Sequence, residues 1–305
     1  MKILVLGAGG IGGFFGSHLH EVKEDVTFLV REKKKLVIEK KGIQIKSAIG
    51  NISIQPNLIT KNQLTPIYDI ILLTCKSYNL EEVIADLEPL NGFGVIIPFL
   101  NGQTHLQKLD SCFNKKNVYG GVAYISSNVD EDGVIQHVGK NNKITFGSRV
   151  GENSDLIKDF YKRCVKTKFD ASLSNNIDQE VWEKWIFIAT VAGATTMFKT
   201  SLDGINKSRE GTKFLMGLFH ECCQISELNG FKIRDEVKNI HESFFVNKNS
   251  KVKASMLIDM ERRSKTEHEH IFKEFINLGN SKKYDPILLN TIYLNMLIYE
   301  GSLLN

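Results

Sequence analysis

The stretch "MKILVLGAGGIGGFFGSHL" (residues 1–19) decides the fold of this chain. Its apolar beginning predicts a short strand, and the residues after the glycines continue as a helix. Between them, Gly7, Gly9 and Gly12 stand in the order G-x-G-x-x-G. A strand, a glycine turn and a helix in this order are typical of a dinucleotide-binding site.

Each glycine of this turn has a separate task. Gly7 permits the tight turn, Gly9 lets a pyrophosphate approach the backbone, and Gly12 lets helix and strand pack closely. The first N–H groups of the helix then face the phosphates. A glycine-rich turn without a ligand is the alternative, and the position directly after a strand favours the dinucleotide. The cofactor-binding residues predicted here are Gly7, Ala8, Gly9, Gly10, Ile11 and Gly12.

Composition excludes several classes of protein. The 305 residues suffice for one large or two ordinary domains, and 42% hydrophobic with 24% charged residues is typical of a globular protein. The net charge of +4 is too small to indicate nucleic acid as a partner. No apolar run reaches the ~18 residues of a membrane span. The first apolar stretch is the glycine motif itself, so we expect no signal peptide.

Cysteine and histidine spacing predicts neither a metal site nor disulfides. The chain has five cysteines, an odd number, and contains no C-x-x-C pair and no H-E-x-x-H. Free cysteines suit a reducing compartment, so we predict a cytoplasmic location.

The first half of the chain predicts an α/β domain of the doubly wound, Rossmann-like type over residues 1–172. Continuous apolar runs are typical of parallel strands buried on both faces, and helical stretches separate several of them. The runs are "KILVL", "VTFLV", "DIILLT", "GVIIPFL" and "NVYGGVAYI", and the stretches "GVIQHVG" and "KITFG" predict a later hairpin.

The character of the chain changes near Ser172. From residue 173 to residue 305 the apolar periodicity is helical, which predicts an all-α second domain for substrate binding or dimerisation. Ligand sites in doubly wound sheets lie at the carboxyl ends of the strands. We therefore expect the reaction centre in the cleft between the two domains.

Arg31 indicates which dinucleotide binds. It ends the second predicted strand, 19 residues after Gly12, where NAD-selective turns carry an acidic residue that binds the ribose. A guanidinium pairs instead with a 2′-phosphate, and Lys33 to Lys35 add positive charge nearby. The sequence thus predicts NADPH. In the alternative, Arg31 only begins a solvated helix and Glu32 binds the ribose.

Lys184 and Glu267 are the candidates for proton chemistry. Lys184 lies in the apolar segment "VWEKWIFIAT" between two tryptophans, and burial would lower its pKa toward that of a general acid. A lysine covering apolar surface, or pairing with Glu180, is the alternative. For Glu267, the spacing Ser264-x-x-Glu267 favours a capping box at a helix start over catalysis.

Three further residues hold positions that suit ligand binding. Lys76 and Asn101 each follow a predicted strand at its carboxyl end, where cofactor and substrate meet. Ser255 supplies a hydroxyl at a helix start.

Together these residues resemble the ketopantoate reductase (2-dehydropantoate 2-reductase) family over essentially the whole chain. The stretches that carry the resemblance are "GAGGIGG", "VTFLVR", "TCKSYN", "FLNGQ", "VWEKW", "SMLIDMERRSKTE" and "YDPILLNTIY".

The resemblance implies a role for each candidate. The glycine turn and Arg31 would hold NADPH, and Lys76 and Asn101 would border the nicotinamide and the substrate. Lys184 would protonate the keto oxygen, giving a D-2-hydroxy acid. The remaining two would contact the substrate, Ser255 by a hydrogen bond and Glu267 by orienting its hydroxyl and the lysine. By analogy with this fold, the apolar surface of the helical second domain suits a homodimer.

The chain departs from the family at two positions. Ile188 and Ala192 stand four and eight residues after Lys184, where the best-studied members carry asparagines. All three lie on one helix face. Three hypotheses follow: reduction of ketopantoate, reduction of a more apolar 2-oxo acid, and a catalytically idle NADPH sensor. The presence of both Lys184 and Glu267 argues against the sensor.

Overall fold

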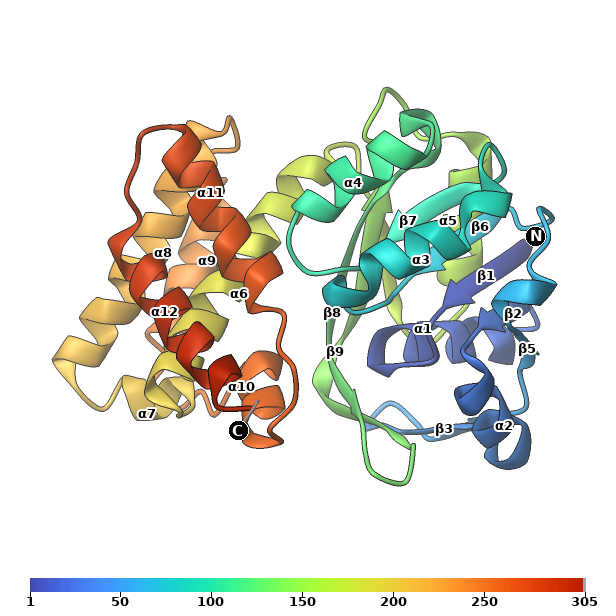
Figure 1. Ribbon diagram of the computed structural model, residues 1–305, viewed down its shortest axis with the longest axis horizontal. Helices are drawn as coiled ribbons and strands as arrows, with labels where there is room; N and C mark the ends of the chain where they lie inside the picture. The colour runs from blue at the N-terminus through green and yellow to red at the C-terminus, as the bar shows by residue number, and fades with distance from the viewer. Residues whose placement is uncertain (304–305) are drawn as a thin grey trace. The chain divides into compact units, whose positions relative to one another are not determined.

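The computed structural model describes residues 1–303, which fall into two compact units. The N-terminal unit contains Met1–Leu100 and His105–Asp178. The helical unit contains Asn101–Thr104 and the chain from Gln179 onward. The prediction of an α/β first part and an all-helical second part is confirmed (Figure 1).

A parallel sheet forms the centre of the N-terminal unit, in the strand order β5-β2-β1-β6-β7. Its apolar runs are buried on both faces, as their composition predicted. Leu6, at the end of β1, pairs with both Leu29 of β2 and Leu73 of β6. The carboxyl ends of these three strands therefore lie side by side. The strands are β1 (Lys2–Leu6), β2 (Asp25–Leu29), β5 (Asn57–Ile59), β6 (Ile70–Leu73) and β7 (Val95–Pro98).

A second sheet covers α1 (Gly10–Glu21), which lies between the two sheets. In the run predicted as a further parallel strand, residues 117–125, Val118 forms a parallel bridge to Ile96 of β7. The residues from Gly120 onward instead belong to β8, which pairs antiparallel with β9. The predicted hairpin over 133–147 is wrong, because residues 135–137 and 142–147 belong to one strand, β9, and both pair with β8, with a break in the register between them. The strands are β3 (Ile43–Lys46), β4 (Ile52–Ile54), β8 (Gly120–Val129), β9 (Ile135–Gly147) and β10 (Asp170–Leu173).

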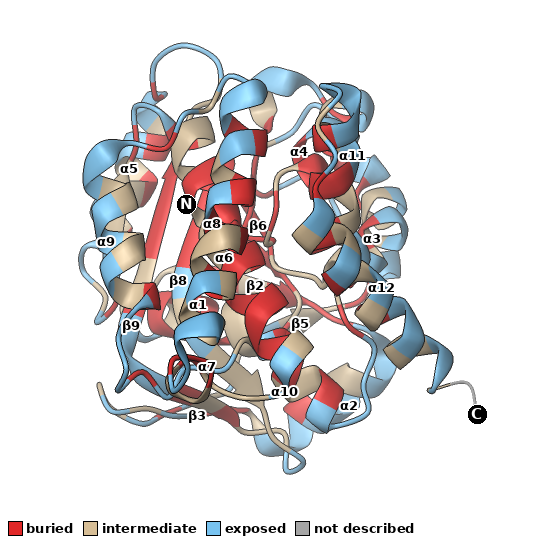
Figure 2. Cartoon of the chain, turned by 90° about the vertical axis from the view of Figure 1, so that its left-hand side faces the viewer, coloured by how far each residue is buried: buried red, intermediate tan, exposed pale blue. Residues whose placement is uncertain are grey.

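The remaining helices complete the double winding. Helices α3 and α4 lie on the face of the parallel sheet opposite α1 (Figures 1 and 2). Figure 2 also shows buried residues on the strands and inner helix faces, with exposed ones on outer faces and loops. These helices are α2 (Glu32–Lys41), α3 (Leu80–Asp86), α4 (Thr104–Cys112) and α5 (Asp155–Cys164).

The helical unit packs around α6 (Ile177–Phe198) and α8 (Arg209–Leu228), whose inward residues share one apolar cluster with those of the later helices. A π-helical turn, η5 (Glu269–Lys273), precedes α11. The other helices are α7 (Leu202–Ile205), α9 (Asp235–Phe245), α10 (Ser255–Glu261), α11 (Glu274–Ser281) and α12 (Ile287–Gly301).

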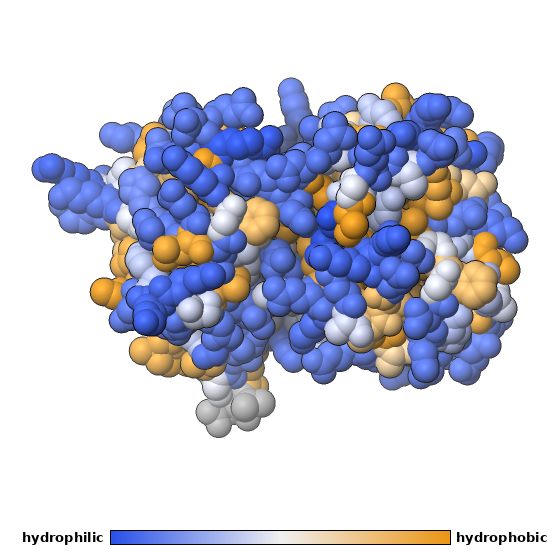
Figure 3. Space-filling model, turned by 90° about the horizontal axis from the view of Figure 1, so that it is seen from above, coloured by the Kyte–Doolittle hydropathy of each residue, from blue (hydrophilic) through white to orange (hydrophobic). Residues whose placement is uncertain are grey.

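Charged and polar side chains dominate the face shown in Figure 3, where apolar ones occur in small groups. Within residues 1–303, no helix is both long and apolar enough to cross a membrane.

Candidate active site

The glycine turn joins β1 tightly to α1. Gly7 has a φ of +97°, a conformation that favours glycine. Gly12 lies so close to the Gly7 carbonyl oxygen and the Thr74 hydroxyl that a Cβ at position 12 would overlap both atoms. Thr74 donates its hydroxyl to the Leu6 carbonyl oxygen at 2.6 Å. Thr74, which directly follows β6, therefore packs against the glycine turn, and only glycine fits at position 12.

The space above Gly9 is open. A Cβ at this position would meet no atom within 4 Å, although Gly9 lies in the middle of a closely packed turn. Gly9 is the N-cap of α1, and the first turn of that helix carries no acidic side chain. Backbone N–H groups and the positive end of the helix dipole therefore border a space that suits an anion. This arrangement fits the pyrophosphate of a dinucleotide.

Arg31 and Lys76 follow the two strands that flank β1. Arg31 is the N-cap of α2, and Lys76 is the N-cap of the short turn Ser77–Asn79 after β6. The register that aligns the ends of β1, β2 and β6 brings both residues to the edge of the sheet where the glycine turn lies. The guanidinium of Arg31 contacts a carboxylate of α3, with 2.6 Å between Arg31 Nη2 and Glu82 Oε2.

A hollow of about 420 Å³ adjoins the glycine turn. Ala8 forms one part of its wall, and the basic side chains of Lys34 and Lys41, on α2, form another. The tip of the β8–β9 hairpin, around Asp132, completes the lining. Positive charge therefore borders the glycine turn on the α2 side, as the lysine-rich sequence of this helix predicted.

Lys184 lies on α6 between two buried tryptophans. The indole of Trp185 donates to the Ile271 carbonyl oxygen at 3.1 Å, which fixes this part of α6 against η5. Burial lowers the pKa of the Lys184 ammonium to about 8, while the negative charge of Glu267 acts in the opposite direction. The expectation of a lowered pKa is confirmed. A lysine with this pKa exchanges its proton near neutral pH, as a general acid must.

Glu267 is not part of a capping box, so that prediction is wrong. Ser264 ends the preceding helix: its amide donates to the Asp259 carbonyl oxygen and that of Arg263 to Met260, while Arg263 has a φ of +52°. This pattern is a Schellman motif. The next helical residue is His268, four positions after Ser264. Glu267 therefore lies directly before a helix, where its charge acts on Lys184.

Glu183 is adjacent to Lys184 in sequence, but it has a different partner. Its buried carboxylate binds the Arg234 guanidinium, with Nη2–Oε2 at 2.5 Å and Nε–Oε1 at 2.9 Å. Burial raises the pKa of Glu183, and the hydrogen bonds from Arg234 outweigh this, so the net pKa is lowered. Adjacent residues on a helix point in different directions. The charged partner that affects Lys184 is thus Glu267.

We expect Arg234→Ala to destabilise the protein by about 2 kcal/mol at pH 7, because it leaves the buried Glu183 carboxylate without its positively charged partner. Urea denaturation would measure this loss, with the exposed Arg262→Ala as the control. The folded pKa of Glu183 is lowered, so the pair stabilises the fold above pH ~4.3 and loses its effect as pH falls through the lowered value. A loss that stays constant down to pH 3 would contradict this assignment.

Asn101 begins the strip Asn101–Thr104, which belongs to the helical unit although it follows β7. Gly102 has a φ of +88° and lies against the imidazole of His270. The Thr104 hydroxyl is 3.3 Å from Nδ1 of the same ring. His270 follows Glu267 by three residues. The strip that carries Asn101 and the turn that carries Glu267 are therefore neighbours.

Ser255 is the first residue of α10 and is exposed. The amide of Ala254 donates to the Thr195 hydroxyl at 3.4 Å, so α10 begins beside α6. Asn101, Lys184, Ser255 and Glu267 thus all belong to the helical unit. Residues 7–12, Arg31 and Lys76 belong to the N-terminal unit, where the register places them at one edge of the sheet.

The sequence did not predict the partners of these residues. Nothing in the sequence links Arg31 to Glu82, 51 positions later, or Gly12 to Thr74. Register is the missing information, since it decides which strand ends become neighbours.

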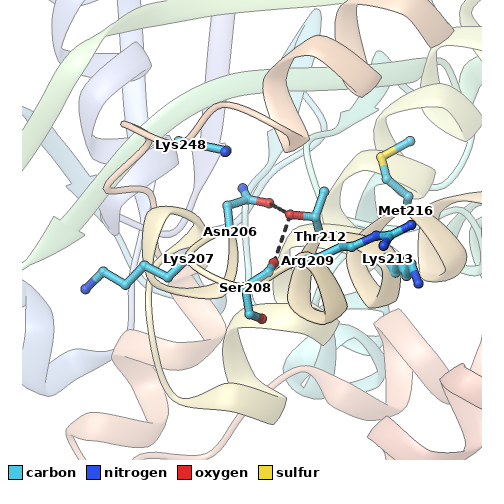
Figure 4. A pocket seen from close by; sticks show the side chains of 8 residues that line it. All are labelled: Asn206, Lys207, Ser208, Arg209, Thr212, Lys213, Met216 and Lys248. Atoms are coloured by element: carbon cyan, nitrogen blue, oxygen red, sulfur yellow. Dashed lines mark hydrogen bonds between the residues drawn. The ribbon is translucent and has the colours of Figure 1, made fainter.

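A second hollow of about 420 Å³ lies at the start of α8, and none of the predicted site residues lines it. Figure 4 shows Arg209 and Lys213 extending to one side of this helix, and Lys207 extending to the other. Its wall consists of Asn206, Lys207, Ser208, Arg209, Thr212, Lys213, Met216 and Lys248.

Comparison with known proteins covers both units. The family model for ketopantoate reductase PanE/ApbA matches residues 3–151, and the model for its C-terminal domain matches residues 176–298. An uncharacterised oxidoreductase of Bacillus subtilis, YkpB, is 35% identical over 303 residues, covering 99% of this chain and all of the relative. A 2-dehydropantoate 2-reductase of Aquifex aeolicus is 22% identical, covering 100% of this chain and 98% of the relative.

A solved structure extends the comparison to the fold. D-mandelate dehydrogenase with NADH and anilino(oxo)acetate has a TM-score of 0.90 and 19% sequence identity, with full coverage of both chains.

The fold, the glycine turn and the named relatives define an NAD(P)-dependent oxidoreductase. Since family models cover most of its length, the chain belongs to the ketopantoate reductase PanE/ApbA family.

Proposed function

We propose that this protein uses NADPH to reduce a 2-oxo acid to a D-2-hydroxy acid. The first candidate substrate is 2-dehydropantoate (ketopantoate), whose reduction gives D-pantoate in pantothenate biosynthesis. The observation that carries the proposal is the lowered pKa of Lys184, about 8, beside the charge of Glu267. A nearly buried lysine that exchanges its proton near neutral pH suits a reaction in which a carbonyl oxygen becomes a hydroxyl.

When bound, the reduced nicotinamide supplies a hydride to the keto carbon of the substrate. Lys184 donates a proton to the oxygen as negative charge develops there. Glu267 keeps enough negative charge beside the ammonium to hold it protonated near neutral pH. Asn101 and Ser255 hydrogen-bond the substrate. One 2-oxo acid, one NADPH and one proton thus give one D-2-hydroxy acid and one NADP⁺.

The N-terminal unit binds the cofactor in this proposal. The open space above Gly9 receives the pyrophosphate, and the glycines on either side keep the backbone close to it. Arg31, at the end of β2, pairs with the 2′-phosphate. Lys76 borders the nicotinamide half at the end of β6.

A second candidate is a reductase of the same family with a more apolar substrate. Ile188 lies one helical turn after Lys184 and is partly exposed, whereas Ala192, a further turn along, belongs to the buried core. Of the two departures, Ile188 is therefore the one that offers apolar surface to a ligand. A site that lacks a hydrogen-bonding partner for a substrate hydroxyl discriminates strongly between substrates. The D-mandelate dehydrogenase similar in fold is named for an aromatic substrate.

The test is NADPH oxidation at 340 nm with ketopantoate and with a panel of aliphatic and aromatic 2-oxo acids. If ketopantoate is the substrate, its kcat/KM exceeds the others by at least about 100-fold, because a buried polar contact discriminates by that much. An inverted order, with branched or aromatic acids first, favours the second candidate. No reduction of any 2-oxo acid by the folded protein contradicts both.

We also propose a cytoplasmic homodimer. Ile287, Leu294 and Ile298 form an exposed apolar stripe along α12 of the helical unit, and such stripes favour association. Light scattering at micromolar concentration would test this, with Ile298→Lys as the disrupting variant.

A further inference from the structure

The ion pair between Arg31 and Glu82 places a carboxylate where the cofactor's distinguishing phosphate is expected. Arg31 Nη2 lies 2.6 Å from Glu82 Oε2, and both side chains are more than half exposed, at 67% and 57%. Neither group is needed to fill the core. The pair connects Arg31, the N-cap of α2, to the first turn of α3, which follows β6.

A guanidinium binds a phosphate best through a pair of parallel N–H groups. Glu82 occupies one of the Nη atoms of Arg31, so a 2′-phosphate must either displace the carboxylate or share the guanidinium with it. A phosphate monoester carries a charge of about −1.5 to −2 at pH 7. Sharing therefore brings two like charges within a few ångströms of each other.

The ribose of NADH carries no 2′-phosphate, so a carboxylate at this position does not repel it. A carboxylate at this edge of the sheet accepts a hydrogen bond from a ribose hydroxyl in NAD-binding folds. The acidic residue of those folds normally ends the second strand, and here that position is Arg31. Glu82 reaches the same edge from α3, which follows β6, the strand on the other side of β1.

We propose that Glu82 sets the cofactor preference of this enzyme by competing with the 2′-phosphate of NADPH for Arg31. The carboxylate weakens NADPH binding and leaves NADH binding intact or improves it. The inference rests on the proposed cofactor role of Arg31. It predicts a weaker preference for NADPH than Arg31 alone would give.

The test compares Glu82→Gln with the wild type by calorimetric titration of NADPH and NADH. The amide keeps the size and an acceptor oxygen but removes the charge. Exposed ion pairs of this kind change affinities by up to about fivefold, and removal of the like-charge repulsion adds to this. We expect the Kd for NADPH to fall about threefold to tenfold, with the Kd for NADH unchanged or raised.

The adjacent residue provides a matched control. Glu81→Gln removes the same charge from the same first turn of α3, but Glu81 pairs with Lys108 at 3.0 Å and its side chain is 84% exposed. It should leave the ratio of the two Kd values within twofold of the wild type. In a protein that already carries Arg31→Ala, Glu82→Gln should change the ratio of the two Kd values no more than the control does. The guanidinium for which Glu82 and the 2′-phosphate compete is then absent.

Equal shifts in Glu82→Gln and Glu81→Gln would overturn the inference, since a general field effect would explain both. Weaker NADPH binding in Glu82→Gln would also overturn it and would assign Glu82 to positioning Arg31. If the wild type binds NADPH and Glu82→Gln changes nothing, the inference alone fails. If the folded wild type binds neither cofactor, the proposed function fails with it.

Discussion

Replacing Lys184 by alanine is expected to lower kcat for 2-oxo acid reduction by a factor of about 10² to 10⁴, the usual contribution of a general acid. The KM should change much less, because Lys184 acts on an oxygen whose charge develops in the transition state. Stopped-flow measurement of NADPH oxidation at saturating substrate would separate the two constants. The protein should remain folded, since the change removes a charge that burial disfavours.

Two variants make this result interpretable. Lys184→Met keeps most of the side-chain volume without the proton, so it should be as inactive as the alanine variant. Lys282→Ala, an exposed lysine after α11, removes one positive charge from the same unit and should retain full activity. A kcat for Lys184→Met within tenfold of the wild type would show that another group donates the proton.

The pH dependence gives an independent readout of the same group. A general acid must be protonated to work, and the pKa of Lys184 is lowered to about 8. We therefore expect kcat/KM to be level below pH 8 and to fall tenfold per pH unit above it. A fall that begins only near pH 10 would point to an ordinary exposed lysine.

The second large effect is expected at the glycine turn, where two alanine substitutions should have different consequences. At position 9 a methyl group enters open space, so Gly9→Ala should cost less than about 1 kcal/mol of stability. The same methyl group stands where the pyrophosphate would approach the backbone. Loss of contacts to a charged phosphate should weaken NADPH binding by about 10-fold to 100-fold.

Gly12→Ala serves as the contrasting variant. Its Cβ would overlap the Gly7 carbonyl oxygen and the Thr74 hydroxyl, so it should lower the free energy of unfolding by about 1–3 kcal/mol. Thermal denaturation without cofactor and calorimetry with NADPH would measure both quantities for each variant. If Gly9→Ala binds NADPH as tightly as the wild type, the cofactor does not lie over this turn.

The fold was predictable because its signals are local. Strands such as "DIILLT" are continuous apolar runs, and the glycine turn has a fixed spacing, so neither depends on distant residues. The helix over 209–228 could be delimited from its pattern alone, because Ser208 caps its start and its apolar positions recur with helical period.

The wrong predictions concern strand pairing and the position at which a helix ends. "GVIQHVG" and "KITFG" resembled a hairpin because polar residues separate them, but residues 135–137 and 142–147 both pair with β8. The residues between them interrupt the ladder, and Gly139 there has a φ of +84°. Ser264 had the spacing of a cap, yet it terminates the helix before it. Both outcomes depend on contacts with residues that the local pattern does not contain.

For the candidate site, the residue types were predictable and their partners were not. The tryptophans around Lys184 indicated burial, and burial does lower its pKa. The salt bridges Glu183–Arg234 and Arg31–Glu82 form because segments distant in the sequence come together in the fold. Such pairings carry no periodic signal in a single sequence.

The strip Asn101–Thr104 has a consequence for how the molecule can be divided. Because four residues from the middle of the N-terminal half belong to the helical unit, the chain passes from one unit to the other three times. A fragment starting at residue 179 would lack the strip that contacts His270. Each unit therefore consists of two separate segments of the chain, and cleavage at one position cannot separate the units intact. Gene fusion or domain exchange within this fold would have to transfer both parts together.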